Sequence, residues 1–390
     1  MTSLERHASF SLALIFALRM LGLFLVLPVF ALEAAKLPGG DDPASVGLAM
    51  GIYGLTQGLL QLPFGIASDR FGRKPVIVLG LLLFAGGSFW AATADNLTGL
   101  LLGRAVQGAG AISAAVTALL ADQTREVVRT KAMALVGGSI ALVFALSLVL
   151  APALAAHIGL TGLFALTGAL AVAGVAVVLW VVPPEPLQHK NQPRGRLREV
   201  LSHAGLLRLN FGVFVLHAVQ LAMWMAVPAL LVQAGLDKAH HWWVYLPAVL
   251  GSFVVMGGSL FALERRGYLR GAFLVAIGLI ALVQLGLLWV ADAPHVSTMA
   301  TLLFLFFCGF NVLEASQPSL ASRLAPAAVR GSALGVYNTL QSLGYFAGGL
   351  AGGALLKWGG THSLFGACGL AMLAWLVVAW PMQAPAKVKA

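Results

Sequence analysis

The chain contains twelve apolar stretches, each long enough to cross a membrane as a helix. A helix needs roughly 20 predominantly apolar residues to span the hydrocarbon core. Charged residues make up only 10% of the chain, whereas soluble proteins carry about 25%. We therefore predict an all-α membrane protein with twelve transmembrane helices. The predicted spans are residues 8–32, 45–67, 75–94, 97–121, 132–156, 161–182, 206–233, 242–263, 271–291, 297–321, 331–356 and 362–381.

The basic residues are distributed in a way that predicts membrane orientation rather than nucleic-acid binding. The net charge is +10. Of the 24 Lys and Arg residues, two (Arg19 and Arg104) lie deep inside predicted spans and three (Lys36, Lys238 and Lys357) in odd-numbered loops; the other 19 lie at the termini, in even-numbered loops or, for Arg208, at the cytoplasmic edge of a span. Basic residues gather on the cytoplasmic side of membrane proteins. We expect a multi-pass protein with both termini in the cytoplasm and no nucleic-acid partner.

One polar segment divides the twelve spans into two sets of six. Residues 183–205 are rich in proline and basic residues, a composition typical of a linker. We predict an N-terminal six-helix bundle at residues 1–182 and a C-terminal six-helix bundle at residues 206–390. Between them we predict a cytoplasmic linker, with a short surface helix near residues 197–203.

A faint internal repeat relates the two predicted bundles. The sequence DRFG at residues 69–72 is followed by ERRG at residues 264–267, an offset of 195 (264 − 69). Internal duplication is how many transporters build two bundles around a site at the membrane midplane. The repeat therefore favours a transporter.

The chain carries no pattern typical of a metal site or an enzyme. Cys308 and Cys368 lie in apolar stretches without a neighbouring His or second Cys, so we predict buried packing for both. The spans contain no H-E-x-x-H or G-x-S-x-G motif and no paired catalytic carboxylates. We expect neither catalysis nor a cofactor nor a bound metal.

The loop between the second and third predicted spans carries the most specific motif. Residues 65–74 read GIASDRFGRK, and this segment resembles the G-x-x-x-D-R-x-G-R-K signature of the major facilitator superfamily. A glycine allows two helices to approach closely, and an acid is stabilised near a helix N-terminus. The resemblance implies the major facilitator fold and a cytoplasmic latch against the start of helix 11, near Gly331. The implied latch residues are Gly65, Asp69, Arg70, Gly72, Arg73, Lys74 and Asp122, the last within reach of Arg73.

The fourth predicted span carries a second motif. Residues 104–108 read RAVQG, which is similar to the R-x-x-Q-G motif of proton-coupled members of the superfamily. An arginine at the centre of a span costs at least about 2.5 kcal/mol unless it faces protein or water. The antiporter motif expected in the fifth span is weaker, because Gly138 and Pro152 are present but serine and alanine replace other expected glycines.

Further segments resemble the YajR group of proposed drug/proton antiporters over nearly the whole chain. That group carries a soluble domain after the last span, and we expect no such domain here, since nine residues follow Pro381. The similar segments are LRMLG at 18–22, GIYGLTQ at 51–57, REVVRTKAM at 125–133, LLRLNFG at 206–212, PSL at 318–320 and GVY at 335–337.

Polar residues gather on the four spans that line the central cavity in this superfamily. A lone polar residue in a span is commonly a helix–helix hydrogen bond, but stripes on all four spans favour a solvated binding cavity. The stripe residues are Arg19 (with Glu33 predicted on the same face) in span 1, Arg104 and Gln107 in span 4, Asn210, His217, Gln220 and Trp224 in span 7, and Asn311, Glu314 and Gln317 in span 10. Further candidates for the cavity wall are Tyr53, Gln57, Asn338, Gln341 and Tyr345.

Four ionisable residues are candidates for proton coupling. Glu314 is the only carboxylate well inside a span, where it is costly unless it is protonated or paired. Histidine is the side chain whose ordinary charge change falls near physiological pH, and His217 is the second candidate. Arg19 and Arg104 are possible partners for a carboxylate.

We therefore predict a monomeric, proton-coupled efflux transporter of small amphipathic compounds in a bacterial inner membrane, working by alternating access. Its expected partners are a small-molecule substrate, protons and the lipid bilayer. Transport of a small organic anion or a lipid, or a transport-inactive sensor, are the alternatives. Substrate identity, direction and stoichiometry stay open.

Overall fold

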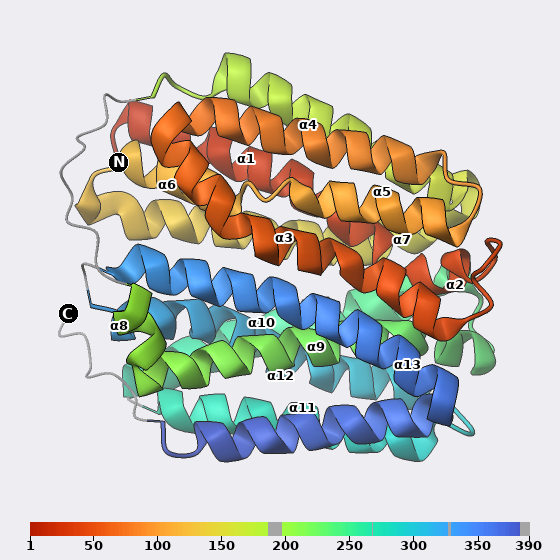
Figure 1. Cartoon of the computed structure of the whole chain (residues 1–390). Helices are drawn as coiled ribbons and strands as arrows, with labels where there is room; N and C mark the ends of the chain where they lie inside the picture. The colour runs from red at the N-terminus through yellow and green to blue at the C-terminus, as the bar shows by residue number, and fades with distance from the viewer. Residues whose placement is uncertain (186–196, 267, 327–328, 383–390) are drawn as a thin grey trace. The chain divides into compact units, whose positions relative to one another are not determined.

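The computed structural model describes residues 1–185, 197–266, 268–326 and 329–382 (Figure 1). The chain forms two compact units, Met1–Gln192 (unit 1) and Pro193–Ala390 (unit 2). Their boundary falls within the predicted linker, of which residues 186–196 lie outside the described part. Each unit is described by itself.

Unit 1 begins with a well-capped helix. The side chain of Thr2 accepts from the backbone of Glu5, whose carboxylate accepts from the backbone of Thr2, which satisfies amides that have no partner within the helix. Asp42 caps the next long helix, which has Pro43 in its first turn, a position that suits proline. The elements are α1 (Ser3–Val26), α2 (Phe30–Ala34), α3 (Pro43–Phe71), α4 (Arg73–Ala92), α5 (Leu97–Ala109), α6 (Ser113–Asp122), α7 (Glu126–Ala176) and the π-helical turn η1 (Val177–Val181).

Unit 2 begins with a short helix at the position predicted for the surface helix. Long helices follow, and α9 is buried along most of its length. The elements are α8 (Leu197–Ser202), α9 (Ala204–Gln233), η2 (Lys238–His240), α10 (Trp242–Arg266), α11 (Leu269–Val290), α12 (Val296–Leu324) and α13 (Arg330–Ala379).

Two helices, α7 and α13, are each long enough to cross a membrane twice. Each contains one glycine in a left-handed conformation, Gly159 (φ 64°) and Gly360 (φ 65°), where the helix turns back. Among the described residues, eight helical segments are apolar and long enough to span, with α5 and α6 counted together as one segment. Two of them, α7 and α13, supply two spans each, which gives ten spans. The helices α3 and α10, of 29 and 25 residues, bring the number formed by the described residues to the twelve predicted.

Two predicted spans are not continuous helices. The stretch 8–32 ends as a helix at Val26, because Pro28 lacks a backbone N–H and its ring clashes with the preceding turn. The prediction that Glu33 shares a face with Arg19 is therefore wrong: Glu33 lies in α2 and pairs with Lys36 at 2.8 Å. The stretch 97–121 breaks between α5 and α6.

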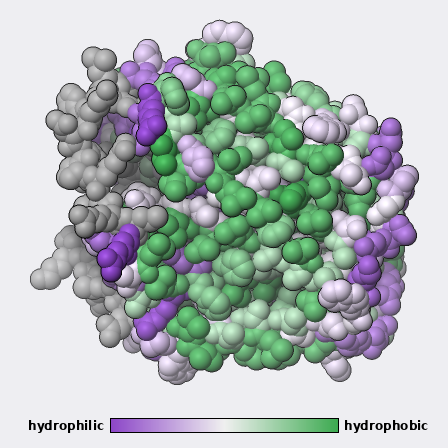
Figure 2. Space-filling model, viewed as in Figure 1, coloured by the Kyte–Doolittle hydropathy of each residue, from purple (hydrophilic) through white to green (hydrophobic). Residues whose placement is uncertain are grey.

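Exposed aromatic residues mark the two ends of each set of spans. Trp180 in unit 1 and Trp380 in unit 2 lie at the ends nearest the linker and the C-terminus, and Trp90, Trp289 and Trp358 lie at the opposite ends. Tryptophan is enriched at both membrane interfaces. On the face seen in Figure 2, hydrophobic side chains cover the middle of the helices and hydrophilic ones gather at their ends.

The same clamp closes each unit at its linker end. In unit 1, Nζ of Lys74 donates to the carbonyl of Val182 at 2.6 Å. In unit 2, Arg270 donates to the carbonyls of Met382 (2.8 Å) and Trp380 (2.5 Å). The offset between the two basic residues is 196 (270 − 74), close to that of the sequence repeat, whose second copy at residues 264–267 lies partly outside the described side chains. In both units the third long helix thus holds the end of the sixth span.

We expect Gly360→Ala to lower the midpoint of thermal unfolding in detergent. The backbone at Gly360 (φ 65°, ψ −163°) lies in a region that costs a residue with a side chain about 1–3 kcal/mol. The matched control is Gly366→Ala in the same helix, where an added Cβ meets nothing within 4 Å and alanine favours the helix. Equal midpoints for the two variants would contradict a strained turn at Gly360.

Candidate functional site

The predicted latch residues of unit 1 meet around one guanidinium. Arg73 donates to the carboxylate of Asp69, to Oγ of Ser68 at 2.8 Å and to the carboxylate of Asp122 at 3.2 Å. Gly72 has φ 98°, a value that glycine adopts readily, and this allows α4 to start directly after α3. The expected Arg73–Asp122 contact is present. The predicted contact near Gly331 would join the two units and stays a prediction.

The other latch residues differ in their surroundings. Arg70 is exposed at the end of α3, and Lys74 forms the clamp to Val182. An added Cβ at Gly65 would meet Cβ of Ala114 at 3.6 Å, an ordinary contact. The prediction that Gly65 permits a close backbone approach is therefore wrong within unit 1.

A close backbone approach of α3 lies instead at Gly108, in the RAVQG motif. An added Cβ there would lie 2.2 Å from Oγ1 of Thr56 and 2.3 Å from the carbonyl of Tyr53. The backbones of α3 and α5 therefore touch at Gly108, as small residues allow between membrane helices. This approach brings Tyr53 next to the arginine of the same motif.

Arg19 is buried in unit 1 and binds the break between α5 and α6. It is 1% exposed. Its guanidinium donates to the hydroxyl of Tyr53 (2.9 Å), the carbonyl of Gly110 (3.1 Å), Oγ of Ser113 (3.2 Å) and Oε1 of Gln57 (3.3 Å). A carbonyl released by a helix break needs a donor in the membrane, and Arg19 supplies it.

Arg104 lies on the other side of the Tyr53 ring. Its guanidinium donates to Oε1 of Gln107 at 2.7 Å and to the carbonyl of Met50 at 3.1 Å, and lies 5.0 Å from the centre of the Tyr53 ring. Gln107 in turn donates to Oγ of Ser88 at 2.9 Å. The predicted pairing of Arg104 with Gln107 on one helix face is present. The roles of Met50 and Ser88 were missed, because a carbonyl and a lone serine give no signal in the sequence.

Neither buried arginine contacts a carboxylate in the part of the chain that the structure describes. Oxygen atoms and aromatic rings surround both guanidinium groups, and such rings attract cations. Nε of each arginine is buried and has no partner among the described residues. Among the described residues, unit 1 therefore holds two buried guanidinium groups that no carboxylate contacts.

A second cluster lies in unit 2, where three helices meet. Nε2 of His217 (α9) lies 3.3 Å from the carboxylate of Glu314 (α12). The side-chain amide of Gln341 (α13) lies 2.7 Å from the same Nε2 and donates to Glu314 at 3.4 Å. The structure thus joins the two proton candidates predicted for unit 2 and adds Gln341, which the sequence placed only on the cavity wall.

The hydrogen bonds define the tautomer of His217. Its Nδ1 lies 2.8 Å from the carbonyl of Val213, and a carbonyl only accepts, so Nδ1 carries a hydrogen. Nε2 then accepts from the amide of Gln341. A further proton can bind only at Nε2, which faces Glu314. The ring of Tyr345 packs edge-on at 4.9 Å, and the imidazole is buried.

The remaining predicted residues of unit 2 are mostly buried. Asn311 donates to Oγ of Ser252 at 2.8 Å, which is the helix–helix alternative. The carbonyl of Asn338 accepts from Ser342, and its side chain has no bond described. Four predicted residues are buried and have side-chain atoms without a hydrogen-bond partner among the described residues. They are Asn210, Gln220, Trp224 and Gln317.

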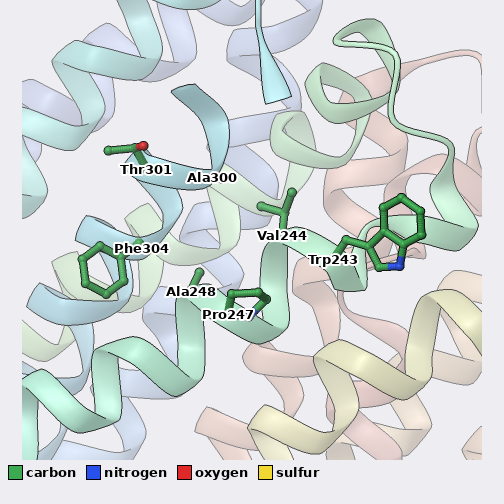
Figure 3. A pocket seen from close by; sticks show the side chains of 7 residues that line it. All are labelled: Trp243, Val244, Pro247, Ala248, Ala300, Thr301 and Phe304. Atoms are coloured by element: carbon green, nitrogen blue, oxygen red, sulfur yellow. The ribbon is translucent and has the colours of Figure 1, made fainter. Parts of the chain in front are cut away.

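An open pocket of about 290 Å³ lies elsewhere in unit 2 (Figure 3). The polar side-chain groups of its lining are the indole N–H of Trp243 and the hydroxyl of Thr301, which donates to the carbonyl of Ser297 at 2.9 Å. No predicted site residue lines it. The lining residues are Trp243, Val244, Pro247, Ala248, Ala300, Thr301 and Phe304.

Known proteins resemble the chain over nearly its full length. Inner membrane transport protein YajR of Escherichia coli (strain K12) is 42% identical over 389 residues, which cover 99% of this chain and 85% of the relative. Multidrug resistance protein MdtH of Aeromonas salmonicida (strain A449) is 28% identical over 386 residues, 96% of this chain and 92% of the relative.

Solved structures show the same fold. The crystal structure of the human organic anion transporter MFSD10 superposes with a TM-score of 0.71 at 18% identity, and covers 97% of this chain and 100% of that one.

The family model described as Major Facilitator Superfamily matches residues 12–349. Twelve spans, the complete GIASDRFGRK segment and relatives that align with nearly the whole chain agree with this match. The chain belongs to the Major Facilitator Superfamily and is a multi-pass membrane transporter, not an enzyme.

Proposed function

We propose that the chain exports small amphipathic compounds in exchange for protons by alternating access, in a bacterial inner membrane with both termini in the cytoplasm. The observation that carries the proposal is the contact of His217, Glu314 and Gln341 within the spans of unit 2. Two titratable groups with one shared amide form a site that can bind and release a proton. The printed names of YajR and MdtH, an inner membrane transporter and a multidrug resistance protein, support the location and the class of substrate.

Glu314 is the proposed proton carrier, with His217 as its partner. The side chain of Glu314 is 39% exposed and that of His217 only 1%, so a proton reaches the carboxylate first. With Nδ1 bonded to Val213, a proton passed to the imidazole binds at Nε2, 3.3 Å from Glu314. The amide of Gln341 can rotate to present its oxygen instead of its nitrogen to a protonated Nε2.

An organic anion is the second candidate substrate. It is favoured by the two guanidinium groups of Arg19 and Arg104, which contact no carboxylate in the described residues. The fold is also that of a human organic anion transporter. Against this, the donors of Arg19 are largely occupied by Tyr53, Gln57, Gly110 and Ser113, so Arg104 would have to bind the anion.

A thermal-stability screen of the purified protein with antibiotics, cationic dyes and organic anions tests the class of substrate. A compound that binds the folded state raises its stability by mass action. We expect amphipathic compounds to raise the unfolding midpoint. If only organic anions raise it, the second candidate replaces the first.

Glu314→Gln should abolish accumulation of such a compound driven by a pH gradient in proteoliposomes, because glutamine cannot exchange a proton. Counterflow of labelled compound at equal pH on both sides should persist, because the alternating-access motion does not need proton release. The control is Glu199→Gln, an exposed acid in α8. Gradient-driven accumulation by Glu314→Gln would exclude Glu314 as the carrier and leave His217.

Arg104→Lys should retain part of the transport activity and Arg104→Ala should lose nearly all of it. Lysine keeps the charge between the Tyr53 ring and Gln107 but lacks the planar fork of donors. Initial rates of counterflow measure the difference. If Arg104→Ala transported at the wild-type rate, Arg104 would have no role in transport beyond packing.

Asp69→Asn should leave the protein folded but weaken the cytoplasmically closed state, because the Arg73 guanidinium loses one of its two anionic partners. With Cys308 and Cys368 replaced by alanine, single cysteines introduced along α6 report access from the cytoplasm through maleimide labelling. We expect faster labelling in Asp69→Asn. The control is Asp95→Asn, an exposed acid at the other end of unit 1. Unchanged labelling together with unchanged transport would refute the latch.

A further inference from the structure

The carboxylate of Glu185 caps the start of α4. Its Oε2 accepts from the backbone N–H of Arg73 at 3.0 Å, and its Oε1 accepts from the backbone N–H of Lys74. The first amides of a helix have no acceptor within the helix, and the helix dipole favours an anion there. The residue at the N-cap position, Gly72, provides no side chain. Glu185, which lies 112 residues after Arg73 along the chain, provides the capping side chain instead.

The segment that carries Glu185 is bonded to its neighbours at several points. Lys74 donates its ammonium to the carbonyl of Val182 at 2.6 Å, and the side-chain amide of Gln123 donates to the carbonyl of Pro183 at 3.0 Å. The start of α4 and the end of the sixth span therefore cap each other. Glu185 lies two residues after Pro183. The hydrogen bonds to Val182 and Pro183 therefore hold its carboxylate at the start of α4.

A glycine at position 72 leaves room for this carboxylate. An added Cβ would lie 3.5 Å and 3.6 Å from the two oxygens of Glu185 and 3.4 Å from the ring of Pro75, and the φ of 98° disfavours any side chain there. Gly72 thus allows the tight turn between α3 and α4 and leaves room for the capping carboxylate.

The cap and the latch meet at the same residue. The backbone N–H of Arg73 binds Glu185, while its guanidinium binds Asp69 and Asp122. The position of the backbone determines where the guanidinium can reach. We propose that Glu185 is a positioning residue of the latch: it holds the start of α4 so that Arg73 bridges the two acids, and it thereby joins the beginning of the linker to the cytoplasmic gate. This inference rests on the latch put forward in the proposed function.

Hydrogen exchange of the full-length protein in nanodiscs tests the cap without any substrate. Glu185→Ala and Glu185→Gln should speed exchange in a peptide that covers the first turn of α4, by about fivefold for alanine and less for glutamine, which still accepts through its amide oxygen. Glu199→Ala, an exposed acid in α8, should leave that peptide unchanged. Equal exchange in wild type and Glu185→Ala would overturn the proposal.

A double-mutant cycle tests whether Glu185 acts through Arg73. The readout is maleimide labelling of cysteines in α6, as for the latch. Glu185→Ala should raise labelling several-fold in the wild-type background and have no effect in Arg73→Ala, because residues that act through one contact are not additive. Glu185→Asp should restore part of the wild-type labelling rate. Equal effects in both backgrounds would overturn the proposed positioning role.

The same assay separates this inference from the latch itself. If Asp69→Asn raises labelling and Glu185→Ala does not, the latch stands and the role of Glu185 is wrong. If neither variant raises labelling, the latch fails and the inference fails with it.

Discussion

The interior of unit 1 is organised by the need to satisfy two buried guanidinium groups. An arginine in the middle of a span costs several kcal/mol unless protein oxygens replace water around it. Arg19 donates to the carbonyl of Gly110, which the break in the fourth span leaves without a partner in the helix. The break therefore supplies an acceptor for Arg19, and Arg19 supplies a donor for the break. Each feature would be costly without the other. Arg104 meets the same need with Gln107, a carbonyl of α3 and the faces of Phe30 and Tyr53.

Unit 2 solves a different problem with similar means. Its buried polar groups include side-chain amides, serine hydroxyls and the imidazoles of His217 and His241, and the carboxylate of Glu314 lies 3.3 Å from His217. The two units share the clamp at the end of the sixth span, yet the described part of unit 1 holds two buried arginines and that of unit 2 holds a contact between a histidine and a glutamate. The two halves of the repeated fold thus differ in the kind of polar group that they bury.

The sequence predicted the spans and the local pairs well, because both depend on residues that are close along the chain. Arg104 and Gln107 lie three residues apart, and helical geometry alone brings them together. The division into six and six spans follows from one polar segment. Hydropathy cannot show where a helix breaks when the residues at the break are apolar, so the interruption at residues 110–112 was missed.

Most contacts between segments that are distant along the chain could not be predicted from the sequence. Gly65 and Gly108 both belong to motifs, and only the packing of α3 against α5 shows that Gly108 is the point of close approach. The partner of His217 could not be chosen among the polar residues of three spans until the helices were placed. The assigned role of Glu185 depends on a contact across 112 residues, which a charged residue in a polar linker does not reveal.

The glycine turns in α7 and α13 have a consequence for how the transporter can be handled. At Gly159 and Gly360 two spans are joined with hardly any loop, so each pair forms a helical hairpin with a very short connection. Both connections are too short to accept an epitope tag or a protease site, or to be bound by an antibody. The connection between α2 and α3, where Gly39 and Asp41 are exposed, is the better place for an insertion on that side of unit 1.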